Sequence, residues 1–159
     1  MRARLCLAAI LFALLGYGLI KPFYHAGQVR SDRHQVQLAP PAEFFRSCSR
    51  DTVSPVHGTF PLTDADVAAF ETRLPPFLEA SNAHPPRSLD HYFFAYAGVL
   101  SNGHRLLYAN VAPDFLLDHG VSADRIYGID VCDGGREFWS IVFDLEQLQF
   151  RDPTFNGPA

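Results

Sequence analysis

The sequence is poor in several of the features by which proteins of known activity are recognised. It holds one Lys, one Met, one Trp and three Cys among 159 residues. Three cysteines are too few for a scaffold held together by many disulfides. No segment repeats at an interval of about 20–50 residues, which excludes a solenoid or a propeller. The chain also lacks the G-x-S-x-G motif, the P-loop and the glycine-rich dinucleotide fingerprint, so no common hydrolase, nucleotide-binding or dehydrogenase pattern is present.

The composition indicates one folded domain with an uneven charge. With 48% hydrophobic and 19% charged residues, the chain is too apolar for a disordered protein. Residues 22–51 carry four Arg against three acidic residues, whereas residues 52–159 carry six Arg against 14 acidic residues. A domain of this charge repels phosphate backbones, and we therefore expect no binding of nucleic acid.

The amino terminus has the pattern of an export signal. Arg2 and Arg4 precede an uncharged run over residues 5–20, which Lys21 closes. A signal-peptide core has about 7–15 apolar residues and a spanning helix about 20, so this run of 16 lies between the two. Residues 1–21 are thus predicted to be a signal peptide or a signal-anchor. The domain is then on the periplasmic side of the inner membrane, anchored through residues 5–20, or soluble in the periplasm or secreted if the segment is cleaved.

Two further parts follow the apolar segment. Residues 22–45 are polar and rich in Pro and Gly, and they are predicted to be a flexible linker. Residues 46–159 are predicted to be an α+β domain. In this domain Thr63 is a candidate N-cap, and apolar residues follow at helical spacing: Val67, Phe70, Leu74 and Leu78. Because proline removes a helical hydrogen bond, Pro75 and Pro76 predict that the helix ends or kinks near Leu74.

After the helix the apolar pattern changes to a period of two. Residues 91–100 and 104–111 flank Asn102-Gly103, a strong signal for a hairpin turn. Both faces of this hairpin are apolar, so we expect one to meet the helix and the other to offer an aromatic surface to a partner. The candidate binding surface consists of the large aromatic residues on these strands and the next: Tyr92, Phe94, Tyr96, Tyr108 and Trp139.

A second hairpin is predicted from residues 125–132 and 137–143. Asp133, Gly134 and Gly135 between them are turn residues, since glycine adopts the positive φ angles that a tight turn needs. The predicted fold is α+β: one N-terminal helix packed on a four- or five-stranded antiparallel sheet of two hairpins, preceded by an N-terminal hydrophobic helix.

Few residues suggest chemistry. Cys48 and Cys132 are the cysteines outside the apolar segment, and in an oxidising compartment we expect them to form a disulfide. The alternative, a nucleophilic cysteine, needs a base beside it. The histidines match no metal motif, and the sequence names no catalytic residue, metal ligand or cofactor. Asp130 or Asp133 would need a histidine brought close by the fold to act in catalysis.

Several short motifs carry a resemblance. They are Cys48-Ser49-Arg50, Phe60-Pro61-Leu62-Thr63, Cys132-Asp133-Gly134-Gly135 followed by Phe138-Trp139, and Phe155-Asn156-Gly157. With them, residues 46–159 resemble small, uncharacterised exported proteobacterial proteins, although Phe60 stands where that pattern has Trp and Ser140 where it has Gly. The order of elements is also similar to cystatin-like and PepSY-like domains. This resemblance implies export and the extent of the domain, and it implies no mechanism.

These observations favour a non-catalytic envelope or periplasmic domain that recognises a protein or a cell-wall partner. An inhibitor or an immunity protein is a special case of this function. The alternatives are a small exported hydrolase of unrecognised type, and a purely structural module in which both faces of the sheet are covered.

Overall fold

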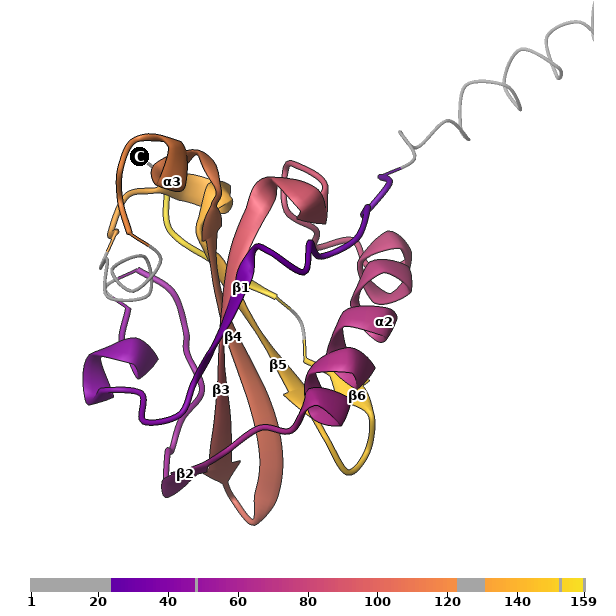
Figure 1. Ribbon diagram of the computed structural model, residues 1–159, viewed down its shortest axis with the longest axis vertical. Helices are drawn as coiled ribbons and strands as arrows, with labels where there is room; N and C mark the ends of the chain where they lie inside the picture. The colour runs from indigo at the N-terminus through magenta and orange to yellow at the C-terminus, as the bar shows by residue number, and fades with distance from the viewer. Residues whose placement is uncertain (1–23, 48, 123–130, 152, 159) are drawn as a thin grey trace, which may run out of the picture.

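The computed structural model describes residues 24–47, 49–122, 131–151 and 153–158. They form an α+β fold, as predicted, with one main helix against a mixed sheet of seven strands (Figure 1). The strands are β1 (His34–Gln37), β2 (Gly58–Phe60), β3 (Tyr92–Ser101), β4 (His104–Pro113), β5 (Trp139–Asp144), β6 (Gln149–Phe150) and β7 (Thr154–Phe155). The helices are α2 (Asp64–Ala80) and α3 (Phe115–Asp118), with the 3-10 turns η1 (Ala42–Phe45), η2 (Leu89–His91) and η3 (Gly135–Glu137).

The hairpin of β3 and β4 has the predicted turn and register. Ser101 pairs with His104, and the turn residues Asn102 and Gly103 have φ angles of 50° and 82°. This hairpin is the centre of the sheet, whose strands run in the order β1-β3-β4-β5-β6. The structural role assigned to Asn102 and Gly103 is confirmed.

The second hairpin is described only in its later strand. Residues 123–130, which include most of the predicted first strand, lie outside the described residues. Gly135 has a φ of 58° and begins η3, which leads into β5. Gly134 is required by close packing, since an added Cβ would overlap the ring of Phe138. Strand β5 then pairs antiparallel with β4, and β6 and β7 both pair with β5.

Helix α2 begins as predicted and ends later than predicted. The Thr63 hydroxyl accepts from the Asp66 N–H at 3.2 Å, and the Asp66 carboxylate accepts from the Thr63 N–H at 2.9 Å, which makes a capping box. The helix then continues through Pro75 and Pro76 to Ala80, so it does not end near Leu74, and of the two predicted outcomes only a kink there stays a prediction. Leu74 and Leu78 are both fully buried, and their burial offsets the hydrogen bonds that the two prolines remove.

The sheet is wider than the predicted four or five antiparallel strands. Strand β1 pairs parallel with β3, on the edge that the β3–β4 hairpin leaves open. Ala26 and Phe44 are buried at 0% and 1% exposure. Residues 24–45 therefore belong to the domain, and the prediction of a flexible linker is wrong for them. This packing was not predictable from the sequence, because one short strand and two isolated apolar residues produce no periodic pattern.

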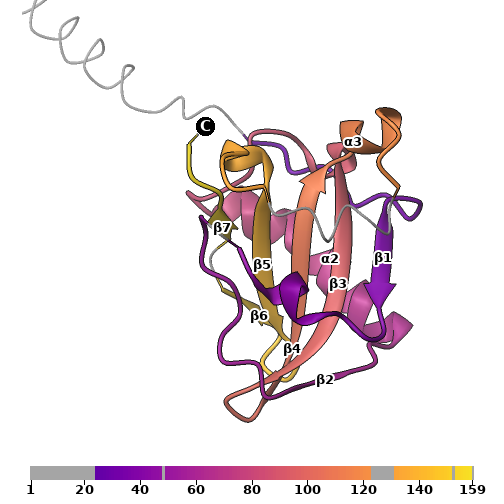
Figure 2. The same ribbon diagram turned by 90° about the vertical axis from the view of Figure 1, so that its left-hand side faces the viewer.

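The two faces of the sheet carry two separate cores (Figures 1 and 2). Helix α2 covers one face, and the chain around η1 and α3 covers the other. The predicted aromatic surface is entirely internal, and each of its five members is 0% exposed: Tyr92, Phe94, Tyr96 and Trp139 on the helix face and Tyr108 on the opposite face. The prediction of an exposed aromatic binding surface is therefore corrected. In the described part of the chain, no helix is long and apolar enough to cross a membrane.

Candidate functional site

The sheet face opposite α2 holds a polar network around Arg50. One terminal nitrogen of the guanidinium donates to the Asn110 side-chain oxygen at 2.5 Å, and the other donates to that of Asn156. Asn156 donates in turn to the carbonyl of Val131. Asn110 is held by β4, whereas Asn156 follows β7 and is 5% exposed. The buried Nε of Arg50 has no hydrogen-bond partner among the described residues.

Arg50 lines an open depression of about 630 Å³, which we call the Arg50 depression. Its wall contains hydroxyl groups, the guanidinium and one carboxylate, from Ser47, Ser49, Arg50, Asp51, Thr154 and Phe155. A smaller cavity of about 100 Å³ shares Asp51 and Thr154 with it and reaches Tyr108 and Ser140. The Thr154 hydroxyl contacts that of Ser140 at 2.8 Å and donates to the Asp51 carbonyl at 2.7 Å. Short segments that are distant in sequence thus meet in one polar site.

Tyr108 is the buried polar group at the floor of this region. Its side chain is 0% exposed, and its hydroxyl makes no well-formed hydrogen bond. Burial raises the pKa of Tyr108, and the charge of the nearby Arg50 opposes that increase. A hydroxyl in such surroundings remains protonated at physiological pH, and the side chains of Ser140 and Arg50 lie near it.

The electrostatics of the depression favour an anionic ligand. Arg50 is the one cation among its lining residues, against the carboxylate of Asp51. Arg136 adds a second guanidinium nearby, 4.0 Å from the ring centre of Phe155. Arginine binds carboxylates and phosphates through several aligned N–H groups. The arrangement can therefore bind and orient an anion, and its described lining residues present no nucleophile paired with a base.

The predicted disulfide borders the same site. Cys48 lies outside the described residues, so its pairing with Cys132 stays a prediction. The flanking chain does converge, because Asn156 contacts both Arg50 and the Val131 carbonyl. The N–H of Gly135 also donates to the Gly157 carbonyl at 3.0 Å, and the N–H of Gly157 donates to the Ser49 hydroxyl at 3.3 Å.

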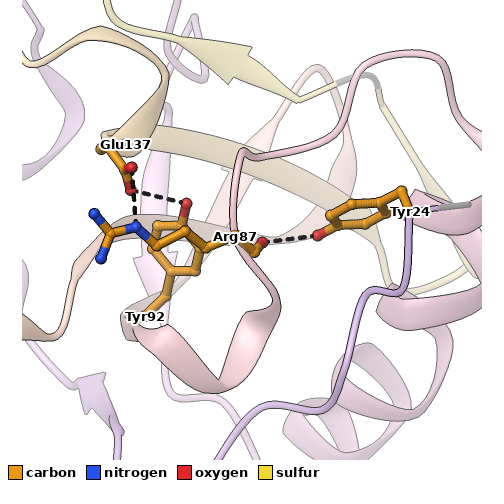
Figure 3. Close-up of polar contacts among 4 residues, drawn as sticks. All are labelled: Tyr24, Arg87, Tyr92 and Glu137. Carbon is orange, nitrogen blue, oxygen red and sulfur yellow. Dashed lines mark hydrogen bonds and ion pairs between the residues drawn. The ribbon is translucent and has the colours of Figure 1, made fainter. Parts of the chain in front are cut away.

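A second polar cluster lies at the end of the sheet where the described chain begins (Figure 3). Glu137 accepts from the Nε of Arg87 at 3.0 Å and from the Tyr92 hydroxyl at 3.1 Å, and the Tyr24 hydroxyl donates to the Arg87 carbonyl at 3.1 Å. Burial, and after it the charge of Glu137, raises the pKa of Tyr92. Burial, and after it the charge of Glu79, raises the pKa of Tyr24. Because both tyrosines remain protonated, this cluster joins chain segments and has no evident role in proton transfer.

Two half-buried histidines, His34 and His104, lie within hydrogen-bond distance of carboxylates at other positions. The Nδ1 of His34 is 2.9 Å from Glu71, to which the Tyr96 hydroxyl also donates at 3.0 Å. The Nδ1 of His104 is 3.0 Å from Asp144. Neither pair lines the Arg50 depression.

The other predicted catalytic partners do not join these pairs. Asp133 is exposed, and Asp130 lies outside the described residues. His91 is 3.9 Å from Asp90, and His119 contacts the Phe115 carbonyl at 2.8 Å.

One group among the described residues has the donors for a metal ion. His104, Asp144 and Glu146 each offer a ligand atom, and these atoms lie within 4.8 Å of one another. Two of the three come from the same turn, where the Asp144 carboxylate already accepts from the N–H groups of Glu146 and Gln147, each at 2.9 Å. These contacts account for the position of Asp144 without an ion.

Sequence reasoning missed Arg50, Asn110 and Asn156 as candidate site residues. Arg50 and Asn156 do fall within the short motifs Cys48-Ser49-Arg50 and Phe155-Asn156-Gly157, which were the one signal that could have singled them out. Asn110 is a polar residue among apolar strand neighbours, but nothing in its sequence context connects it to Arg50. Comparisons with protein-family models, with curated proteins and with solved structures gave no match.

Proposed function

We propose that the chain is an exported, non-catalytic binding domain that recognises an anionic group on an envelope protein or a cell-wall component through the Arg50 depression. The observation that carries this proposal is Arg50, the cation among the described residues that line the open depression. Hydroxyl groups at Ser47 and Ser49 supply further donors around the same space. A carboxylate or a phosphate fits this set of donors.

The proposal includes the expected location and covalent structure of the chain. Residues 5–20 act as an export signal or a membrane anchor, so that the domain is on the periplasmic side of the inner membrane. Cys48 and Cys132 form a disulfide beside the depression and hold its rim in place. The resemblance to small exported proteobacterial proteins supports the expected export and the extent of the domain.

The alternative function is that of a small exported hydrolase. The contact of 3.0 Å between His104 and Asp144 favours it, since a carboxylate can orient an imidazole for general-base catalysis. Substituting His104 separates the two functions. His104→Gln leaves binding at the Arg50 depression unchanged, whereas it abolishes a hydrolytic activity that depends on this pair.

Capture of a partner from an envelope extract tests the main proposal. The tagged full chain serves as bait, and the captured material is quantified by mass spectrometry for the wild type, Arg50→Gln and Arg46→Gln. Arg46 is an exposed residue of the same segment, so it controls for loss of one positive charge. Because a hydrogen bond to a charged group contributes about 1.5–3 kcal/mol, we expect Arg50→Gln to weaken binding about tenfold or more. Arg46→Gln is expected to leave binding within about twofold.

Titration with acetate and with inorganic phosphate, followed by calorimetry at low salt, identifies the anion. Saturable binding that Arg50→Gln removes supports the proposal. Equal capture by the wild type and Arg50→Gln, with both variants folded by circular dichroism, would contradict it.

A further inference from the structure

The folded domain begins immediately after the apolar segment. The Tyr24 hydroxyl donates to the Arg87 carbonyl at 3.1 Å, and the Tyr24 ring stacks on His84 with ring centres 4.0 Å apart. Two residues later, Ala26 is fully buried, and its N–H donates to the Glu79 carboxylate at 3.2 Å. The chain is thus fastened to the domain from Tyr24 onward (Figure 3).

This early start leaves almost no tether. Three residues, Lys21 to Phe23, separate the apolar run at residues 5–20 from Tyr24. A residue spans at most about 3.6 Å, so Tyr24 lies within about 14 Å of Ile20. The headgroup layer on each side of a bilayer is about 5–8 Å thick. If residues 5–20 are in the hydrocarbon core, Tyr24 is therefore at the headgroups or at most about 9 Å beyond them.

We propose that the end of the domain that carries Tyr24, Arg87 and Phe115 lies against the headgroup surface of the membrane in which residues 5–20 are anchored. This proposal rests on the anchored form of the proposed function. Arg87 and Phe115 are 45% and 38% exposed, and the guanidinium is 5.9 Å from the ring centre. Tyrosine, phenylalanine and arginine all place an apolar body at a membrane surface, and tyrosine and arginine add a polar end directed to water.

Charge does not determine this orientation. Arg87 is paired with Glu137 at 3.0 Å, and the exposed His25 is 3.3 Å from Glu79. The surface therefore carries both signs and has little net attraction for anionic lipid. The short connection to the apolar segment fixes the orientation, which is consequently insensitive to salt and sensitive to the length of that connection.

The same geometry places the opposite end of the sheet away from the membrane. The turn at Asn102-Gly103 lies at the other end of the molecule from α3 and from the first described residues (Figures 1 and 2). Leu100, beside this turn, is 39% exposed, which closely matches Phe115. The two side chains form a matched pair, one on the proposed membrane side and one distant from it.

Photo-cross-linking to lipid tests the orientation. The full chain, with p-benzoylphenylalanine at position 115 or at position 100, is reconstituted in vesicles of phosphatidylethanolamine and phosphatidylglycerol and irradiated. Mass spectrometry then measures the fraction of the chain that carries a lipid adduct. We expect position 115 to form several-fold more adduct than position 100, at low and at high salt.

A longer tether is the second arm of the experiment. An insertion of about twelve Gly and Ser residues between Phe23 and Tyr24 adds a flexible length of about 20 Å. We expect this insertion to reduce the adduct at position 115 several-fold while flotation with the vesicles is unchanged. Equal adducts at both positions, or no effect of the insertion, would overturn the proposal.

Different experimental results would overturn this orientation and the proposed function. A chain that does not float with vesicles overturns both the anchor and this orientation, and it leaves binding at the Arg50 depression to be judged by partner capture. A chain that floats and loses its partner on Arg50→Gln, but forms equal adducts at both positions, overturns the orientation alone.

Discussion

The two faces of the sheet are covered by different kinds of chain. On the helix face, α2 places Phe70, Leu74 and Leu78 against strand residues, and each of these three side chains is 0% exposed. On the opposite face, the covering chain is the irregular segment around η1 and the chain around α3. That face also holds Arg50 and the buried hydroxyl of Tyr108, which makes no well-formed hydrogen bond.

This difference indicates that the helix face mainly stabilises the fold, whereas the opposite face holds the proposed binding site. A regular helix satisfies its own backbone hydrogen bonds and seals one face with apolar side chains. An irregular segment must satisfy its polar groups through side chains, which is the role of the Arg50 network. The face that is less completely sealed holds both the Arg50 depression and the smaller cavity that adjoins it.

The largest effect is expected on the helix face. Phe70 is fully buried, and its ring centre lies 5.3 Å from that of Tyr96 and 5.3 Å from that of Phe150. Phe70→Ala leaves a cavity that a packed helix and sheet cannot close, so it should cost about 4–5 kcal/mol of unfolding free energy. Chemical denaturation measures this cost. Phe115→Ala, at a side chain that is 38% exposed, serves as the control and should cost less than about 1 kcal/mol.

A matched truncation on the other face should cost less. Phe44 is 1% exposed, with its ring centre 5.7 Å from that of Tyr108. Phe44→Ala should cost about 3 kcal/mol, because an irregular segment relaxes into the space more easily than a helix does. Hydrogen exchange should then increase around η1 while it stays unchanged in α2. A loss of protection throughout α2 as well would show that the two faces are not independent.

Removal of single hydroxyl groups compares the two faces at neutral pH. Tyr96 donates to Glu71 at 3.0 Å on the helix face, whereas the Tyr108 hydroxyl has no well-formed partner. Tyr96→Phe should cost about 1.5 kcal/mol, since it removes a hydrogen bond to a charged acceptor. Tyr108→Phe should change the unfolding free energy by less than about 0.5 kcal/mol. A large cost at Tyr108 would indicate a hydrogen bond that the structure does not show.

The smallest comparison concerns alkaline pH. Burial, and then the charge of Glu71, raises the pKa of Tyr96 well above 10.0, whereas the charge of Arg50 opposes the increase at Tyr108. In the unfolded chain both tyrosines lose their protons near pH 10, while the folded protein keeps them. Stability is therefore constant below about pH 9 and falls as the pH rises past 10 toward the folded pKa. Tyr96→Phe should flatten this decrease more than Tyr108→Phe, in denaturation curves measured across the alkaline range. Equal flattening would mean that Arg50 does not affect Tyr108.

Local features of the fold were predictable because a few adjacent residues determine them. Asn102-Gly103 specified the turn and, with it, the register of β3 on β4, since those two residues accept positive φ angles. Thr63 specified the start of α2 through its own hydroxyl. The end of α2 was not predictable in this way, because burial of Leu78 against the sheet allows the helix to continue past Pro75 and Pro76.

The candidate site was not predictable from local pattern. Asn110 and Asn156 are separated from Arg50, which joins them, by 60 and 106 residues along the chain. No periodicity relates them, and each is an ordinary polar residue in its own segment. The aromatic residues that the pattern did single out became core, because the pattern shows that a face is apolar and does not show what covers it.

The sequence by itself determined the α+β class, the capping of α2, the central hairpin and the two apolar faces of that hairpin. These features follow from hydrogen bonds, backbone preferences and apolar patterns among residues that are close in sequence. The tertiary structure decided that residues 34–37 join the sheet as β1, that both faces are covered, and that Arg50 meets Asn110 and Asn156. Those outcomes depend on which distant segments bury each other, and burial is a property of the whole fold.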